Sequence, residues 1–147
     1  MGNSLKVMLV DDEGTRLEGF KMLFDGKAYG CEIVCEAYDG VMAVNLAKTY
    51  KPDIIIMDIN IPVMSGLDAL RMIRSHNENC ACIIVSGYDE FEYCREALRL
   101  QITDYILKPV DFREFGKVID AVKLKLIREK QPAAEEKDNK PVFQLAA

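Results

Sequence analysis

Five side chains that can bind a metal ion or a phosphoryl group follow short apolar runs of the sequence. They are Asp11, Asp12, Asp58, Ser86 and Lys108. Each could simply be a polar residue that ends a buried strand. In an open α/β sheet, however, ligands bind in the crevice at the carboxyl ends of the strands. Parallel strands would therefore bring three carboxylates, one hydroxyl and one ammonium group to one rim, and we expect this set to hold a divalent cation and a phosphoryl group.

The three carboxylates favour a magnesium site. Two unit charges about 4 Å apart repel by roughly 4 kcal/mol at an effective dielectric near 20, and a hard cation removes that cost. Oxygen ligands in an incomplete shell suit Mg²⁺, which keeps several waters. Taken alone, Asp11 and Asp12 would be interpreted as a helix N-cap and a solvated charge, but the addition of Asp58 favours metal binding.

Asp58 is also the candidate acceptor of a phosphoryl group. It follows four apolar residues, where a charge is costly unless a metal or hydrogen bonds hold it. A carboxylate at this position can attack phosphorus and form an aspartyl phosphate. Mg²⁺ on one side and Lys108 on the other would offset the charge that builds during transfer. Ser86, with Gly87 beside it, would be a second donor to the phosphoryl oxygens.

Strand and helix patterns alternate five times along the chain. We expect strands at Leu5–Val10, Glu32–Glu36, Ile54–Asp58, Cys80–Ser86 and Tyr105–Lys108. We expect helices at Gly14–Asp25, at Val41–Tyr50, after a Ser65 cap, from Asp89 or Glu90 to about Leu100, and at Asp111–Lys130. Strict alternation with short connections predicts a parallel sheet with helices on both faces.

Apolar residues at helical spacing mark the faces that should pack on the sheet. The first three helices carry Leu17, Phe20 and Phe24, then Val41, Val44 and Ala47, then Leu67, Leu70 and Ile73. The last helix carries Phe112, Phe115, Ile119, Val122 and Leu126. Beyond Lys123 this pattern outruns what the sheet can cover, so we interpret Leu124 to Ile127 as a contact for a partner helix or as a connector.

Composition narrows the class of protein. The 147 residues, half of them hydrophobic and 29% charged, indicate one soluble domain, and the net charge of -5 disfavours stand-alone nucleic-acid binding. No apolar run suits a membrane span and no signal peptide is visible, so we expect a cytoplasmic protein.

Five cysteines without a Cys-x-x-Cys pair indicate buried hydrophobic residues rather than disulfides or zinc ligands. His76 is the only histidine, and we expect it at a helix end on the surface.

From about Leu5 to Ile127 the chain resembles the receiver domain of bacterial two-component response regulators. The matching motifs are VMLVDDE, IIIMDINIPVMSGLDAL, IIVSGYDEFEYCREAL and DYILKPVD. The resemblance implies a flavodoxin-like, doubly wound α/β fold whose five-stranded parallel sheet has the order 2-1-3-4-5 and carries five helices. We expect the receiver domain at residues 5–128 and a linker or tail at residues 129–147.

The resemblance also implies roles for the residues of the rim. Asp58 would take a phosphoryl group from a partner histidine kinase in a Mg²⁺-dependent reaction. Asp12 would bind the metal directly, Asp11 largely through water, and Asn60 through its backbone carbonyl. Lys108 would contact the phosphoryl group.

A switch is a further implication of the resemblance. Lys108-Pro109 would be a cis peptide bond, and Ser86 and Tyr105 would form the switch pair. Their movement would remodel the face built from the helix expected at residues 89–100, the strand Tyr105–Lys108 and the last helix. That face would control an output, and a homodimer through it is a further expectation.

The phrase SGYDEFEYCREAL is similar to receivers that precede an AraC-type helix-turn-helix domain. We therefore expect control of transcription through a DNA-binding domain outside this chain; the alternative is a stand-alone receiver that acts by protein–protein contact. An enzyme is disfavoured, because a haloacid-dehalogenase-type phosphatase needs Asp-x-Asp and the chain has Asp11-Asp12-Glu13, with only a partial likeness at Asp58-Ile59-Asn60. A binding module that never takes up phosphate is disfavoured by the pairing of Asp58 with Lys108.

Overall fold

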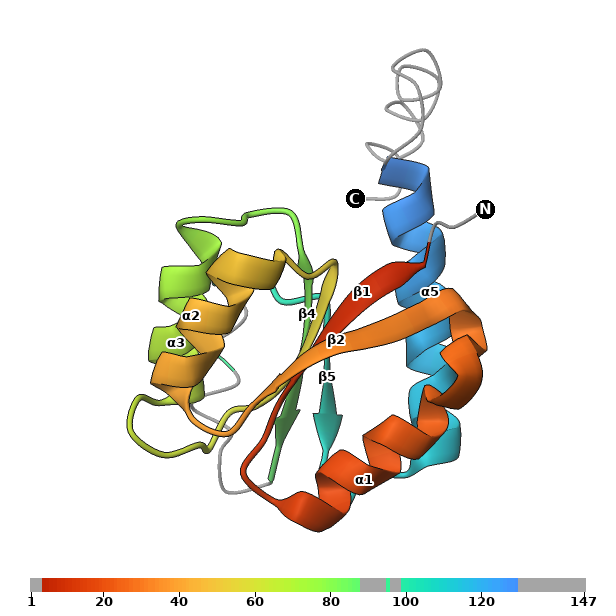
Figure 1. Ribbon diagram of the computed structural model, residues 1–147, viewed down its shortest axis with the longest axis horizontal. Helices are drawn as coiled ribbons and strands as arrows, with labels where there is room; N and C mark the ends of the chain where they lie inside the picture. The colour runs from red at the N-terminus through yellow and green to blue at the C-terminus, as the bar shows by residue number, and fades with distance from the viewer. Residues whose placement is uncertain (1–3, 88–94, 96–98, 130–147) are drawn as a thin grey trace.

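A five-stranded parallel sheet with the order β2-β1-β3-β4-β5 forms the centre of the molecule (Figure 1). The computed structural model describes residues 4–87, 95 and 99–129, without the side chains of residues 26–28. The strands are β1 (Leu5–Val10), β2 (Cys31–Ala37), β3 (Ile54–Asp58), β4 (Ala81–Ser86) and β5 (Asp104–Leu107). The predicted fold class and strand order are confirmed.

Helices cover both faces of this sheet. Within the described residues they are α1 (Gly14–Leu23), α2 (Gly40–Tyr50), α3 (Gly66–Arg74) and α5 (Phe112–Glu129), together with the 3-10 helix η1 (Asp25–Gly30). Figure 1 shows α2 and α3 on one face of the sheet and α1 and α5 on the other. The helix predicted near residues 89–100 and the predicted tail lie largely outside the described residues.

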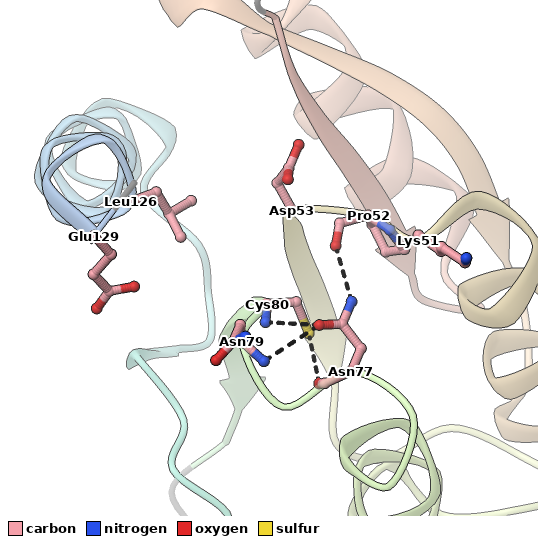
Figure 2. Close-up of a pocket in the computed structure, with 8 residues that line it drawn as sticks. All are labelled: Lys51, Pro52, Asp53, Asn77, Asn79, Cys80, Leu126 and Glu129. Atoms are coloured by element: carbon pink, nitrogen blue, oxygen red, sulfur yellow. Dashed lines mark hydrogen bonds between the residues drawn. The ribbon is translucent and has the colours of Figure 1, made fainter. Parts of the chain in front are cut away.

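A pocket of about 480 Å³ lies at the amino ends of β3 and β4, away from the strand ends that carry the polar residues (Figure 2). The side-chain amide of Asn77 donates to the carbonyl of Pro52 at 3.3 Å. The side-chain oxygen of Asn77 accepts from the backbone N–H of Cys80 at 3.1 Å. The first bond holds the loop between α3 and β4 against the residues that precede β3, and the second closes that loop on itself.

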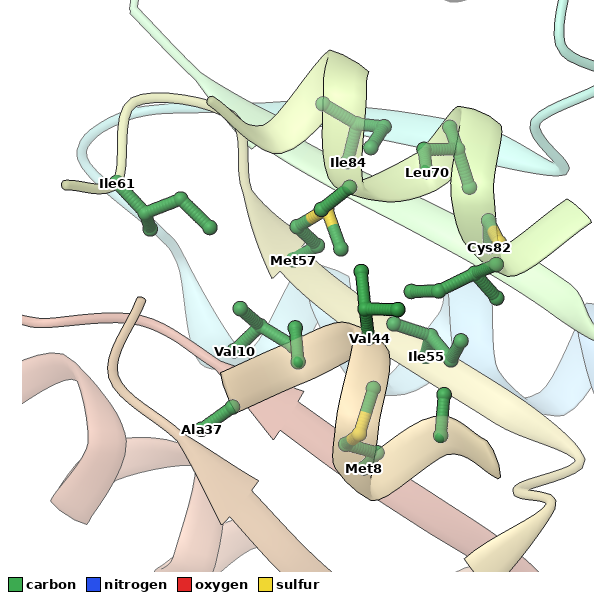
Figure 3. Close-up of a cluster of buried hydrophobic side chains, with 14 of the residues drawn as sticks. Met8, Val10, Ala37, Val44, Ile55, Met57, Ile61, Leu70, Cys82 and Ile84 are labelled. Atoms are coloured by element: carbon green, nitrogen blue, oxygen red, sulfur yellow. The ribbon is translucent and has the colours of Figure 1, made fainter. Parts of the chain in front are cut away.

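Strands β1, β2, β3 and β4 supply side chains to both layers of the core, because successive Cβ atoms of a strand point to opposite faces. Met8 and Ile55 pack in the cluster beneath α2 and α3 (Figure 3), whereas Leu9 and Ile54 pack in the cluster beneath α1 and α5. Every residue of β3 is buried, as predicted for a central parallel strand covered on both sides.

Two of the three residues predicted for the buried face of the α2 helix are confirmed, and the third is not. Ala43, Val44 and Ala47 are buried, but Val41 is 41% exposed, so its place in the predicted stripe was wrong. The cause is the close approach of Gly40 to the backbone of Met64, where a Cβ atom would collide with the Met64 carbonyl. This contact turns Gly40 inward, and Val41, one residue further, faces outward.

The α1 and α5 helices differ from prediction mainly near their carboxyl ends. The α1 helix stops at Leu23 rather than Asp25, and the chain continues into η1, which was not predicted. In α5 the buried stripe extends beyond Lys123, because Leu126 packs in the core beneath α1 and α5. Only Leu124 and Ile127 of that last stretch are large exposed apolar residues, at 62% and 49% exposure.

The Ser65 cap, three of the cysteines and the single histidine lie as predicted. Ser65 caps α3 and accepts from the backbone N–H of Asp68 at 3.2 Å. Cys31, Cys80 and Cys82 are buried free thiols, whereas Cys35 is half-buried and Cys94 lies outside the described residues. His76 is exposed just beyond α3. Among the helices of the described ranges, none is both long and apolar enough to cross a bilayer.

Candidate functional site

The predicted polar residues lie at the carboxyl ends of the strands, and the backbone there remains bonded to the sheet. Asp58 is the last residue of β3 and Ser86 the last of β4. The residues just beyond β1, β3 and β5 each donate a backbone hydrogen bond to a neighbouring strand. These bonds run from Asp11 to Ala37 at 3.0 Å, from Ile59 to Val85 at 3.0 Å and from Lys108 to Ser86 at 2.8 Å.

The start of α3 packs against the backbone around Asp58. A Cβ atom on Gly66 would lie 2.7 Å from the Cα of Ile59 and 3.1 Å from the carbonyl oxygen of Asp58. The N–H of Gly66 also donates to the carbonyl of Ile59 at 3.0 Å. A residue without a side chain is therefore needed at position 66 to let this helix support the end of β3.

The three acids that we expected to meet do so. One carboxylate oxygen from each of Asp11, Asp12 and Asp58 lies within 4.8 Å of the others. Asp11 and Asp58 are each 2% exposed, whereas Asp12 is exposed to solvent. This oxygen-only donor set, buried on one side and open to water on the other, fits Mg²⁺.

Lys108 approaches the same cluster from the end of β5. Its Nζ atom lies 3.1 Å from Oδ1 of Asp58, and the N–H of Asn60 donates to that oxygen at 3.0 Å. Burial raises the pKa of the Asp58 carboxyl, and the N–H of Asn60 opposes this rise. The charge of Asp11 raises the pKa further, and Lys108 opposes that increase. Asp58 is thus a buried carboxylate held between an acidic neighbour and a cation.

The remaining predicted residues of the site differ in how far they are buried and in what they contact. The hydroxyl-bearing Ser86 is fully buried, whereas Tyr105 on β5 is 43% exposed. The Lys108-Pro109 peptide bond is cis, as predicted. Asn60 contacts Asp58 through its N–H, while the predicted roles of its carbonyl and of the pair formed by Ser86 and Tyr105 remain predictions.

Arg16 is a component of the site that was not predicted from the sequence. Its Nε and Nη2 atoms donate to the two oxygens of Asp11 at 2.6 and 3.0 Å, and Nη2 also donates to Oδ2 of Asp58 at 2.8 Å. Burial lowers the pKa of Arg16, but the hydrogen bond and the charge of Asp11, with the charge of Asp58, outweigh this and raise it. The sequence did contain a signal for this contact, because Arg16 is a cation in the first turn of the helix that follows Asp11 and Asp12.

The fold and this site define a class of signalling domain, and comparison with known sequences gives the same class. Residues 7–120 match the response regulator receiver domain family. The chain belongs to that family. Receiver domains are phosphorylatable domains of two-component signalling systems rather than enzymes of the usual kind, and they bind Mg²⁺ at an acidic pocket.

Two solved structures share this fold. The receiver domain of AraT, a response regulator from Geobacillus stearothermophilus, is 39% identical with a TM-score of 0.81, and the match covers 86% of this chain and 98% of that one. The receiver domain of the sensor histidine kinase PA1611 from Pseudomonas aeruginosa was solved with a magnesium ion in its active site cleft. It is 25% identical with a TM-score of 0.67, over 80% of this chain and 96% of that one.

A curated relative is longer than this chain. The transcriptional regulatory protein HptR of Staphylococcus aureus is 35% identical over 114 residues, which are 78% of this chain but 44% of that protein. The chain spans slightly less than half the length of the curated relatives that it matches.

Proposed function

We propose that this receiver accepts a phosphoryl group from a histidine kinase onto Asp58 in a Mg²⁺-dependent reaction. The observation that carries the proposal is the position of the Asp58 carboxylate. It lies 3.1 Å from the Lys108 ammonium and within 4.8 Å of carboxylate oxygens of Asp11 and Asp12. The Asp58 carboxylate can therefore act as the nucleophile while Lys108 and the metal-binding acids lie beside it.

The side chains have separate tasks in this reaction. A carboxylate oxygen of Asp58 forms a bond to phosphorus while the bond from phosphorus to the donor's histidine nitrogen breaks. Lys108 offsets negative charge on the phosphoryl oxygens, and the Asn60 N–H holds the Asp58 carboxylate in place. The buried hydroxyl of Ser86 is the second donor. Mg²⁺, held by Asp11, Asp12, Asp58 and the Asn60 carbonyl, would supply further charge neutralisation.

Phosphorylation would be read out on the face that includes β5 and α5. Ser86 and Tyr105 form the proposed switch pair, and a coupling of roughly 1–3 kcal/mol would change the affinity for a partner or for a second copy of the domain. In this proposal residues 5–128 are the receiver and residues 129–147 lead to a DNA-binding output domain. The HptR relative, which is named as a transcriptional regulator and is longer than this chain, supports that output.

The test uses a small phosphodonor, because the kinase is unidentified. The chain is incubated with radiolabelled acetyl phosphate and Mg²⁺, and hydroxylamine-labile phosphate on the protein is counted. We expect incorporation to approach one phosphoryl group per chain and to be lost with EDTA. A chain that binds Mg²⁺ yet stays unlabelled would contradict the proposal.

Loss of Asp12 is expected to weaken Mg²⁺ binding more than loss of Asp11. Asp12 is exposed, whereas both oxygens of Asp11 already accept hydrogen bonds from Arg16. We expect Asp12→Ala to raise the Kd for Mg²⁺ by about tenfold or more, as calorimetric titration would measure it, and Asp11→Ala to raise it less. Equal losses would contradict the assignment of Asp12 as the direct ligand and Asp11 as the ligand through water.

A further inference from the structure

Arg16 occupies the oxygens that a metal ion at this site would need. The two buried acids have four carboxylate oxygens, and Arg16 contacts three of them, both on Asp11 and Oδ2 on Asp58. The fourth, Oδ1 of Asp58, accepts from Lys108 and Asn60. The Arg16 side chain is 18% exposed, against 3% for Asp11 and 2% for Asp58, so these contacts are largely shielded from water.

The guanidinium group also supplies one positive charge to the cluster, half of what a divalent metal ion would supply. The three carboxylates carry three negative charges, and Arg16 and Lys108 return two positive ones, which leaves one net negative charge. Without Arg16 the same cluster would carry two. The forked contact with Asp11 is the bidentate geometry that makes arginine–carboxylate pairs strong.

A divalent cation and the guanidinium cannot use the same oxygens at the same time. Mg²⁺ requires oxygen ligands at about 2.0–2.1 Å in near-octahedral geometry. In the structure the facing sides of Asp11 and Asp58 are filled by nitrogen atoms at 2.6–3.0 Å. Binding of the ion would therefore require these contacts to break.

The backbone of Arg16 is well placed to stay still while its side chain leaves. Glu13 caps α1 and accepts from the Arg16 N–H at 2.6 Å, and the N–H of Leu17 donates to the Glu13 carbonyl at 3.1 Å. Because the first turn of the helix is held by these bonds, only side-chain rotations are needed to release the two acids.

We infer that Arg16 is an internal counter-cation that neutralises the acidic cluster in the metal-free protein and competes with Mg²⁺ for Asp11 and Asp58. The inference rests on the Mg²⁺ dependence of the proposed function. Competition lowers the affinity for the ion, so the concentration of Mg²⁺ at which the domain becomes competent for phosphorylation is set partly by a residue that the reaction itself does not need.

The test compares the intact chain with Arg16→Met, which keeps the length of the side chain and removes its charge. Calorimetric titration with Mg²⁺ should show binding about tenfold tighter in this variant. In EDTA its urea midpoint should lie below that of the parent chain, and saturating Mg²⁺ should narrow the difference. Lys117→Met is the matched control, because Lys117 is 77% exposed on α5 and the variant has the same net charge; its Mg²⁺ affinity should equal that of the parent.

The outcomes separate this inference from the proposed function. Unchanged or weaker Mg²⁺ binding in both Arg16→Met and Arg16→Gln would overturn the inference, even if the parent chain takes up phosphate. Tighter binding without any phosphate uptake would support the inference and contradict the proposed function. A variant that folds only when Mg²⁺ is present would also support the inference, whereas one that folds in neither condition would overturn it, since Arg16 would then be required by the fold.

Discussion

Asp58→Asn is expected to reduce labelling by acetyl phosphate to background, even with saturating Mg²⁺. The amide has the size of the carboxylate but lacks a nucleophilic oxygen that can form an acyl phosphate. Hydroxylamine-labile radioactivity per chain measures the effect, and intact-mass spectrometry checks it independently. No other single substitution at this rim should remove the acceptor itself.

The matched control is Asp68→Asn, which changes an exposed acid in the first turn of α3. The radioactivity incorporated per chain should equal that of the parent chain. Labelling that persists in Asp58→Asn would mean that another group is the acceptor. Asp58→Asn also removes the ion pairs of Asp58 with Arg16 and Lys108, so circular dichroism has to show that the variant is folded before its loss of labelling is assigned to the missing acceptor.

Phe20→Ala is expected to lower the free energy of unfolding by about 3–5 kcal/mol, a large part of the total for a domain of this size. Phe20 is 1% exposed, and its ring meets those of Phe112 and Phe115 edge to face, with centroids 5.1 and 5.0 Å apart. The substitution removes the side chain that joins α1 to α5 and leaves a cavity between them. Urea unfolding followed by circular dichroism would measure the change.

Met22→Ala is the control on the same helix. Met22 is 75% exposed, so its removal should change the free energy of unfolding by no more than about 0.5 kcal/mol. If Phe20→Ala cost less than about 1 kcal/mol, the proposed role of this aromatic contact in joining the two helices would be wrong.

The fold was largely predictable because its signals are local. The bounds of β3 agree with prediction to the residue, since four consecutive apolar residues follow Pro52 and Asp53 in the sequence. The η1 helix had no such signal. Its form depends on packing that is distant in sequence, with Tyr29 at a φ of 64° against the ring of Phe24 and in contact with Gly116 of α5.

The site was predictable where strand position alone determines location. Asp58 and Lys108 could be grouped because parallel strands end at one rim, and their side chains do meet, whereas the contact of the Ser86 hydroxyl with a phosphoryl group stays a prediction. Arg16 could not be placed in this way. The direction of a helical side chain depends on how the helix lies on the sheet, and that placement is set by the contacts of Phe20 with α5.

The backbone hydrogen bonds of Asp11, Ile59 and Lys108 to their neighbouring strands carry a mechanical consequence. These amides continue the hydrogen-bond ladders of the sheet beyond the ends of the strands. The backbone around the groups that would bind a cation or a phosphoryl group is therefore bonded directly to the sheet. A substitution that shifts β3 against β4, even deep in the core, would misalign the reactive carboxylate directly.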